Sequence, residues 1–318
     1  MLDIWIEKYR PKNLSEIHGQ KENIQKLKSF VNAKELPHLI FAGPAGTGKT
    51  SAALALSIEL FGENYKENLL ELNASNERGI DVIRENVKDF ARIKPSNELG
   101  FKIIFLDEAD QLTSEAQAAL RRTMELYSST TRFIFSCNYS SQIIPPIQSR
   151  TVVMRFRPLI PDQMKSRLND IARKEDFTID EDSLTAITEI SEGDMRKALN
   201  ILQAIYSSGE VSARRIYEIA GYAQPSDFKK LLSTSISGLF DEARAVLDRM
   251  LIEDGLSGMD IVKGLHSYVR KEPIAPRQKI EIIMALAEAE FRIVEGSSDN
   301  IQLDALLAKI AYIGNEYS

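Results

Sequence analysis

Residues 43–50 read GPAGTGKT, which matches the spacing GxxxxGK[ST] of a phosphate-binding loop. The loop follows the apolar run LIFA and leads into the helix-like stretch TSAALALSIELF. Its three glycines permit backbone conformations that turn successive N–H groups towards phosphate oxygens at a helix N-terminus. The Lys49 ammonium then reaches the β- and γ-phosphates, and the Thr50 hydroxyl ligates Mg²⁺. The residues expected to contact the nucleotide here are Gly43, Pro44, Ala45, Gly46, Thr47, Gly48, Lys49, Thr50 and Ser51.

Two acidic residues follow a second apolar run, in KIIFLDEAD at 102–110. Carboxylates at the end of a buried strand are costly unless they serve a cation or a water molecule. Asp107 is expected to hold Mg²⁺ directly or through water, and Glu108 to polarise the water that attacks the γ-phosphoryl group. The pair favours hydrolysis over transfer to a second substrate. An acidic helix N-terminus, stabilised by the helix dipole, is the alternative interpretation.

A third apolar run, FIFSC, ends directly before Asn138. The expected strand order brings Asn138 next to Asp107, where its amide can bind the γ-phosphate or orient the water. An asparagine that only forms a turn is the alternative.

The elements that position these residues form a parallel α/β sheet according to the sequence. Between residues 36 and 160, short apolar runs alternate with longer amphipathic stretches: LIFA at 39, LLELN at 69, IIFLD at 103, FIFSCN at 133 and VVMRF at 152. Runs that are apolar throughout predict strands covered by helices on both faces. The nucleotide site is then expected at the carboxyl ends of the strands.

Strand signals stop after RFRPLIP at 155–161, and helical patterns broken by Gly, Ser and Pro continue to the end. A second break is expected in GYAQPSD at 221–227. The predicted domains are an α/β domain at 1–161 and two helical domains at 162–224 and 225–318.

The composition of the chain narrows the classes of function that it can have. The 318 residues are 43% hydrophobic and 27% charged, as in ordinary globular proteins, and the net charge of −6 argues against nucleic-acid binding by overall positive charge. DNA contact therefore needs a local basic patch. The charged first ten residues do not resemble a signal peptide, and no apolar run reaches the roughly 20 residues of a membrane span. The single cysteine, Cys137, excludes an intramolecular disulfide and suits a reducing interior.

One candidate basic patch lies in NERGIDVIRENVKDFARIK, where the apolar residues follow helical spacing. Arg84, Lys88 and Arg92 then share another face and can follow DNA phosphates without reading sequence. The alternative is an ordinary solvated face, because acidic residues lie close enough to pair with these bases.

Several strings together resemble the small subunit of replication factor C, the AAA+ clamp loader, of the archaeal type: WIEKYRPKNL at 5, GPAGTGKT at 43, NASNERGID at 73, FLDEAD at 105, RRTME at 121, FSCNY at 135, IQSRT at 147 and GDMRKALN at 193. They cover most of the first two predicted domains, in the family's order. The resemblance implies that Ile6 and Arg10 lie near the adenine and its phosphates. It makes Asn138 the first sensor, Arg196 of the lid the second sensor, and Arg150 an arginine finger that acts on a neighbouring subunit's ATP.

The same resemblance implies an AAA+ P-loop domain, a helical lid and a C-terminal helical collar that joins subunits. The implied activity is DNA-stimulated hydrolysis of ATP with Mg²⁺, in a ring-like hetero-oligomer of a large subunit and other small subunits. Its partners are a sliding clamp, which it opens, and the primer-template DNA on which it loads the clamp. No membrane is involved, and the expected location is cytoplasmic, at the nucleoid in an archaeon or in the nucleus of a eukaryote.

Three positions depart from the family pattern, and none is a catalytic side chain. Ala45 stands for the commoner Pro, Thr151 for Cys and Glu192 for Gly. The last bears on the turn that holds Arg196.

Other functions remain as alternatives. An AAA+ helicase or protein-remodelling motor needs an aromatic pore motif after the second strand, and NASNERGID has none. A nucleotide-switched scaffold without appreciable hydrolysis is disfavoured by Glu108, Asn138 and Arg150. A small-molecule kinase is disfavoured because the sequence suggests no acceptor pocket.

Overall fold

The structure is a computed structural model that describes residues 4–75 and 80–317. The chain divides into two compact units, Met1–Ile179 with Ile187–Gln203, and Asp180–Ala186 with Ala204–Ser318. Among the described residues, no helix combines the length and the apolar character that crossing a membrane demands.

The first unit is built on a five-stranded sheet in the order β2-β3-β4-β1-β5, with every neighbouring pair parallel. The strands are β1 (His38–Ala42), β2 (Leu69–Asn73), β3 (Lys102–Asp107), β4 (Thr131–Cys137) and β5 (Thr151–Arg155). The predicted α/β class, the five strands and the adjacency of β3 and β4 are therefore confirmed.

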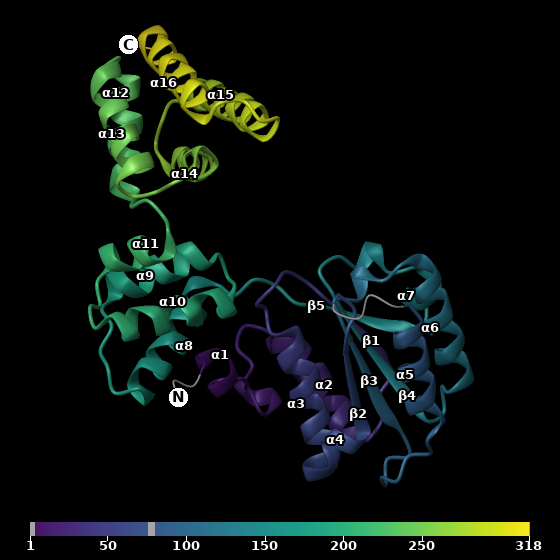
Figure 1. The fold of residues 1–318 in the computed structure, drawn as a ribbon. Coiled ribbons are helices and arrows are strands. Elements are labelled where there is room, and N and C mark those ends of the chain that lie inside the picture. The colour runs from purple at the N-terminus through teal and green to yellow at the C-terminus, as the bar shows by residue number, and fades with distance from the viewer. Residues whose placement is uncertain (1–3, 76–79, 318) are drawn as a thin grey trace. The chain divides into compact units, whose positions relative to one another are not determined.

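Helices cover both faces of this sheet. In Figure 1 the two groups of helices stand on opposite sides of the strands. One face packs against α2 (Lys21–Ala33) and α3 (Lys49–Phe61), with α4 (Tyr65–Asn68) beside α3. The other face packs against α5 (Ile80–Arg92), α6 (Ser114–Leu126) and α7 (Pro145–Gln148).

Each central strand contributes to two separate cores. In β1, Leu39 and Phe41 are buried with α2 and α3, whereas Ile40 is buried with α5 and α6. Side chains alternate across a strand, so an apolar run fills both cores at once. This alternation explains why the run LIFA of β1 carries no polar residue.

The expectation of cover on both faces is wrong for the edge strand β5. Val152 and Val153 are 41% and 37% exposed. β5 pairs only with β1, and helices that span the middle of a twisted sheet leave its margin open.

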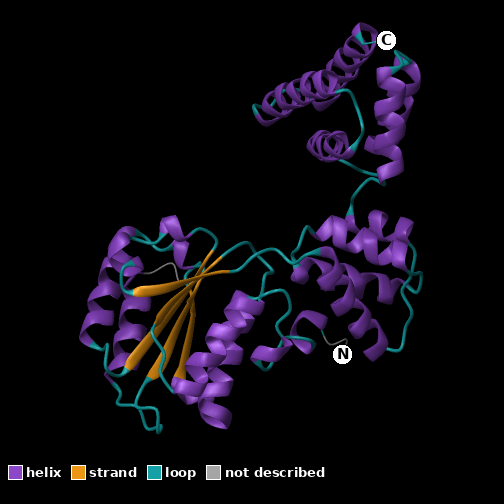
Figure 2. Ribbon diagram, turned by 180° about the vertical axis from the view of Figure 1, so that it is seen from behind, coloured by secondary structure: helices purple, strands orange, loops and turns teal. Residues whose placement is uncertain are grey.

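All regular elements after β5 in the described part of the chain are helices, as Figure 2 shows by colour. They are α8 (Pro161–Lys174), α9 (Glu181–Ser191), α10 (Met195–Ser208), α11 (Ala213–Ala220), α12 (Pro225–Ile236), α13 (Phe240–Ile252), α14 (Gly258–Lys271), α15 (Pro276–Val294) and α16 (Asp299–Glu316). Three of them begin with proline, whose fixed φ and missing N–H suit the first helical position. Near the start of the described chain, the short helix α1 (Trp5–Lys8) precedes α2 and the sheet.

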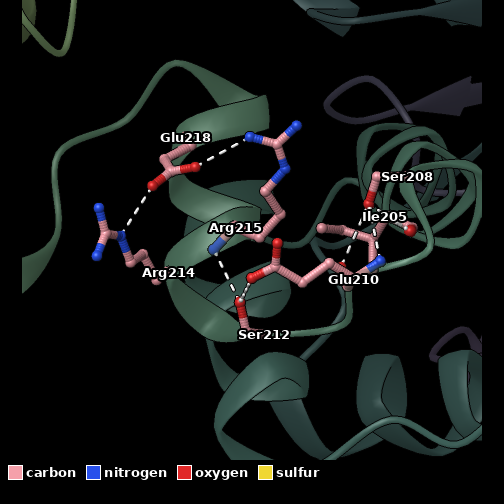
Figure 3. Close-up of polar contacts among 7 residues, drawn as sticks. All are labelled: Ile205, Ser208, Glu210, Ser212, Arg214, Arg215 and Glu218. Carbon is pink, nitrogen blue, oxygen red and sulfur yellow. Dashed lines mark hydrogen bonds and ion pairs between the residues drawn. The ribbon is translucent and has the colours of Figure 1, made fainter.

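Helices α12–α16 enclose one hydrophobic core within the second unit. Ahead of them, the start of α11 is fixed by polar contacts (Figure 3). The Ser212 hydroxyl accepts a hydrogen bond from the Arg215 N–H at 3.2 Å, which caps the helix. Glu218 bonds both Arg214 and Arg215, and these bonds lower the pKa of Glu218. The predicted break in GYAQPSD coincides with the C-cap of α11 at Gly221 and the start of α12 at Pro225.

We predict that His38 makes the first unit less stable in acid. Its Nδ1 accepts a hydrogen bond from the Phe133 N–H at 3.0 Å, and burial, with the nearby Arg132 charge, lowers the His38 pKa to about 4. Protonation would place an N–H donor on His38 Nδ1 against the Phe133 N–H. The contribution of His38 to the free energy of unfolding is therefore fully present above pH 6.5 and falls as the pH drops towards 4. The expected loss between pH 7 and pH 5 is about 2 kcal/mol more than in His38→Gln. Urea unfolding followed by the fluorescence of Trp5, the single tryptophan, measures it; parallel pH curves for both proteins would contradict the prediction.

Candidate functional site

The predicted phosphate loop connects β1 to α3. Gly46 and Gly48 adopt φ of +65° and +96°, which favour glycine. Lys49 opens α3 with only 9% of its surface exposed, and its Nζ donates to the carbonyl oxygens of Gly43 at 2.6 Å and Pro44 at 2.8 Å. Burial lowers the Lys49 pKa, while the negative charge of Asp107 opposes that shift. The loop thus concentrates N–H donors and one cation at the N-terminus of a helix.

Thr50 and Asp107 meet directly although they are far apart in sequence. The Thr50 Oγ1 donates to Asp107 Oδ2 at 2.7 Å. A hydroxyl and a carboxylate beside a phosphate loop are the hard oxygen ligands that Mg²⁺ prefers, so these two residues fit the ion.

Glu108 follows β3 in an unusual backbone conformation. Its φ of +54° is left-handed, which non-glycine residues adopt at a cost of about 1–3 kcal/mol. The conformation turns the chain out of the strand and into the one-turn 3₁₀ helix Ala109–Gln111. The Glu108 side chain is left exposed and lines the same pocket as Lys49.

Asn138 lies at the end of the neighbouring strand, as predicted. The register pairs Leu106 with Phe135, so β3 and β4 end side by side. The backbone N–H of Asn138 donates to Asp110 Oδ2 at 2.9 Å. The end of β4 is therefore joined to the turn that follows Glu108.

One pocket of the first unit collects most of the predicted nucleotide residues. Those that line it are Ile6, Arg10, Ala45, Gly46, Thr47, Gly48, Lys49, Thr50, Ser51, Asp107, Glu108, Asn138 and Arg196. Gly43 and Pro44 are not among the lining residues and contribute the carbonyl oxygens that hold Lys49.

Twelve lining residues were not predicted as site residues, among them Tyr9, His18, Asp110 and Arg167. The Arg167 Nη2 donates to the Tyr9 carbonyl oxygen at 3.0 Å, which ties α8 to the N-terminal segment. Burial, and then the Arg167 charge, lower the His18 pKa. These residues come from separate elements at irregular spacing. Tyr9 and Asp110 lie within the strings WIEKYRPKNL and FLDEAD that carry the family resemblance, whereas His18 and Arg167 lie in none of those strings.

The turn that carries Arg196 rests on the phosphate loop. The Met195 N–H donates to the Gly46 carbonyl oxygen at 3.1 Å, and Asp194 Oδ1 accepts from the Arg196 N–H at 2.8 Å. Glu192, which stands where the family has glycine, takes a left-handed φ of +49°. The substitution therefore leaves a left-handed turn before Arg196.

Arg150 is placed elsewhere: it is not among the residues that line this pocket. It lies between α7 and β5, and its Nη2 forms an ion pair with Glu125 Oε1 at 2.8 Å. Arg121, four residues before Glu125 on α6, pairs with the same oxygen at 3.4 Å. Two guanidinium groups therefore share one carboxylate on the surface.

The three predicted DNA-binding residues fall on α5. Lys88 is exposed, and Arg92 lies 3.8 Å from Asp89. The side chain of Arg84 is outside the described residues. The buried Val87 on this helix belongs to the core of the sheet.

Comparison with known proteins agrees with this geometry. Residues 39–159 match the ATPase family associated with various cellular activities (AAA), residues 166–207 the RCF1/5-like AAA+ ATPase lid domain, and residues 223–309 the replication factor C C-terminal domain. The replication factor C small subunit of Thermoplasma volcanium is 70% identical over 316 residues, which are 99% of each chain. The chain belongs to the replication factor C small-subunit family. It is an ATP-hydrolysing P-loop ATPase that serves clamp loading in replication.

Other replication factor C small subunits are similar over the same length. Those of Picrophilus torridus and Archaeoglobus fulgidus are 66% and 52% identical, each over 99% of both chains. Among solved structures, Thermotoga maritima RuvB, a Holliday junction branch migration motor, aligns with a TM-score of 0.56 at 18% identity, over 78% of this chain and 92% of that chain. At this identity the likeness concerns the fold alone.

We predict that Gly46→Ala weakens ATP binding by tenfold or more. A Cβ at Gly46 would lie 1.7 Å from Asp194 Oδ1, so the lid turn and the loop must move apart. Isothermal titration with ATP measures the effect.

Gly100→Ala is the matched control, because Gly100 has a similar φ of +71° and nothing within 4 Å of its added Cβ. It should cost about 1 kcal/mol of stability and leave ATP affinity unchanged. Equal ATP affinities for the two variants would contradict the role given to the contact between loop and lid.

Proposed function

We propose that this chain is the DNA-stimulated ATPase subunit that opens a sliding clamp and places it on primer-template DNA, as part of a ring with a large subunit and other small subunits. The observation that carries the proposal is the convergence of Lys49, the bonded pair of Thr50 and Asp107, and Glu108 on one pocket. The proposed domains are the ATPase domain at 1–161, the lid at 162–224 and the collar at 225–318. The proposed compartment is the cytoplasm, at the nucleoid.

Each group has one task in hydrolysis. The loop N–H groups and Lys49 hold the triphosphate, and Thr50 and Asp107 would hold Mg²⁺, which would supply neutralisation of the phosphate charge. Glu108 accepts a hydrogen bond from the attacking water and aligns it with the γ-phosphorus. Asn138 and Arg196 contact the γ-phosphate from β4 and from the lid, and Ile6 and Arg10 close the site around the adenine and its phosphates.

Arg150 acts in trans in this proposal. It is 41% exposed and is held away from its own pocket by Glu125, so it is available to a neighbouring subunit. An arginine that stabilises the charge of the transition state from a second chain makes turnover depend on assembly. ATP bound between subunits then selects one ring geometry, and its hydrolysis releases that geometry.

A surface on the collar supports assembly into a ring. On α15, Ile280, Met284, Phe291 and Val294 are 59–66% exposed, and their spacing places them along one stripe of the helix. Contiguous exposed apolar side chains of this kind mark contact surfaces between proteins.

Binding of ATP at a subunit interface predicts complementation between two inactive variants. Glu108→Gln removes the water-polarising carboxylate, and Arg150→Ala removes the finger, so each variant alone should lose at least 95% of turnover, on the order of the effects known for such groups. Small subunits mixed equally before assembly should recover roughly a quarter of the turnover, because one random neighbour pair in four joins an intact Glu108 to an intact Arg150. ATPase assays of the assembled complex measure it. Absence of recovery would place Arg150 outside the neighbour's site, and full turnover in Glu108→Gln would mean that Glu108 does not polarise the attacking water.

The proposed DNA face of α5 predicts that Arg84→Ala with Lys88→Ala reduces the stimulation of ATPase activity by primed DNA and leaves basal turnover near normal. Each lost phosphate contact should reduce the slope of log affinity against log salt by about one unit. The matched control is Lys21→Ala with Lys26→Ala, which removes the same charge from exposed positions of α2 on the opposite face of the sheet. If both double variants respond to DNA alike, α5 is an ordinary solvated helix.

A further inference from the structure

Asp110 is an acidic residue of the pocket to which the hydrolytic mechanism gives no role. It follows Asp107 and Glu108 by two residues and lines the pocket with them. Its Oδ2 accepts a hydrogen bond from the backbone N–H of Asn138 at 2.9 Å. Its Oδ1 is buried and has no hydrogen-bond partner among the described residues.

The backbone around Asp110 is fixed on one side by Glu108. Asp110 is the middle residue of the 3₁₀ helix Ala109–Gln111, whose N-cap is Glu108, and the Gln111 N–H donates to the Glu108 carbonyl oxygen at 2.9 Å. The position of Asp110 is therefore set relative to Glu108. The bond to Asn138 crosses from this turn to the end of β4, so one carboxylate links the water-polarising residue to the proposed sensor.

The register of the sheet alone does not supply this link. The pairing of β3 with β4 ends at Leu106 and Phe135, and β4 itself ends at Cys137. Beyond these positions the chain continues without strand pairing between the two ends. A charged acceptor on a main-chain N–H is a strong and directional bond that can hold the end of β4 in place.

We propose that Asp110 is a positioning residue for Asn138: its carboxylate binds the main chain of the sensor to the turn of Glu108, so that the sensor amide and the water-polarising carboxylate keep one separation. The proposal rests on the function proposed above for Glu108 and Asn138. Displacements of about 1 Å at such groups lower rates by as much as a hundredfold, so the bond affects turnover more than binding.

The test uses the complex assembled with the large subunit and compares Asp110→Ala, Asp110→Asn, Asn138→Ala and the double variant Asp110→Ala with Asn138→Ala. Asp110→Ala should lower kcat by roughly tenfold or more and change KM for ATP by less than about twofold. Asp110→Asn, whose amide oxygen accepts the same N–H, should keep kcat within about threefold of the unmodified complex. The double variant should be no slower than Asn138→Ala, because the bond acts only through the Asn138 side chain.

Three outcomes would overturn the proposal: unchanged kcat in Asp110→Ala, effects of the two substitutions that multiply in the double variant, or an Asp110→Asn complex as slow as Asp110→Ala. If Asp110→Ala does not fold, as judged by Trp5 fluorescence, Asp110→Ser replaces it, because the serine hydroxyl is too short to reach the same N–H. Failure of the proposed function itself gives a different result: Asn138→Ala alone would leave kcat unchanged, which would mean that Asn138 is not a sensor.

Discussion

The site depends on one constraint: five parallel strands end at the same edge of a buried sheet. The runs LIFA of β1 and IIFL of β3 are apolar because both faces of these central strands are covered, and the acid pair stands where β3 stops. The phosphate loop leaves β1 there, the acid pair leaves β3 and Asn138 leaves β4. The Thr50–Asp107 bond then joins two of these ends across β4. The cation of Lys49 is stabilised at this edge by main-chain carbonyls and by the nearby acid.

A second consequence is that the loop and the lid share a contact. The turn before Arg196 donates a hydrogen bond to Gly46 and fits against it so closely that no side chain can replace the hydrogen of the glycine. On its other side, Gly193 accepts a hydrogen bond from the Leu159 N–H, beside the segment that leads out of β5. A change in the conformation of the loop therefore reaches the start of α10. This is a physical route by which phosphate binding can orient the lid.

The charge distribution fits a chain that works in an assembly. The protein is acidic overall, yet Arg121 and Arg150 meet at one surface carboxylate and basic residues occur together on α5. An exposed ion pair contributes little to the stability of the fold. The effect of this one is to fix where the guanidinium groups lie. In the proposed arrangement, in which a neighbour's Arg150 supplies one transition-state charge, hydrolysis is coupled to assembly.

The sequence alone determined the features that depend on short spacing. The phosphate loop between a strand and a helix, the acid pair after β3 and the five strands were predicted correctly, because each is encoded within about ten consecutive residues. The family was predicted correctly from the joint occurrence of several such short strings. The roles of Arg84, Lys88 and Arg150 stay predictions, since they concern DNA or a second chain. Only the tertiary structure decided the rest, including the exposed margin at β5. Tyr9, His18 and Arg167 reach the pocket from the N-terminal segment and α8, and Asp110 bonds a residue 28 positions away. Such contacts depend on how elements pack, and packing distance has no fixed relation to distance along the chain.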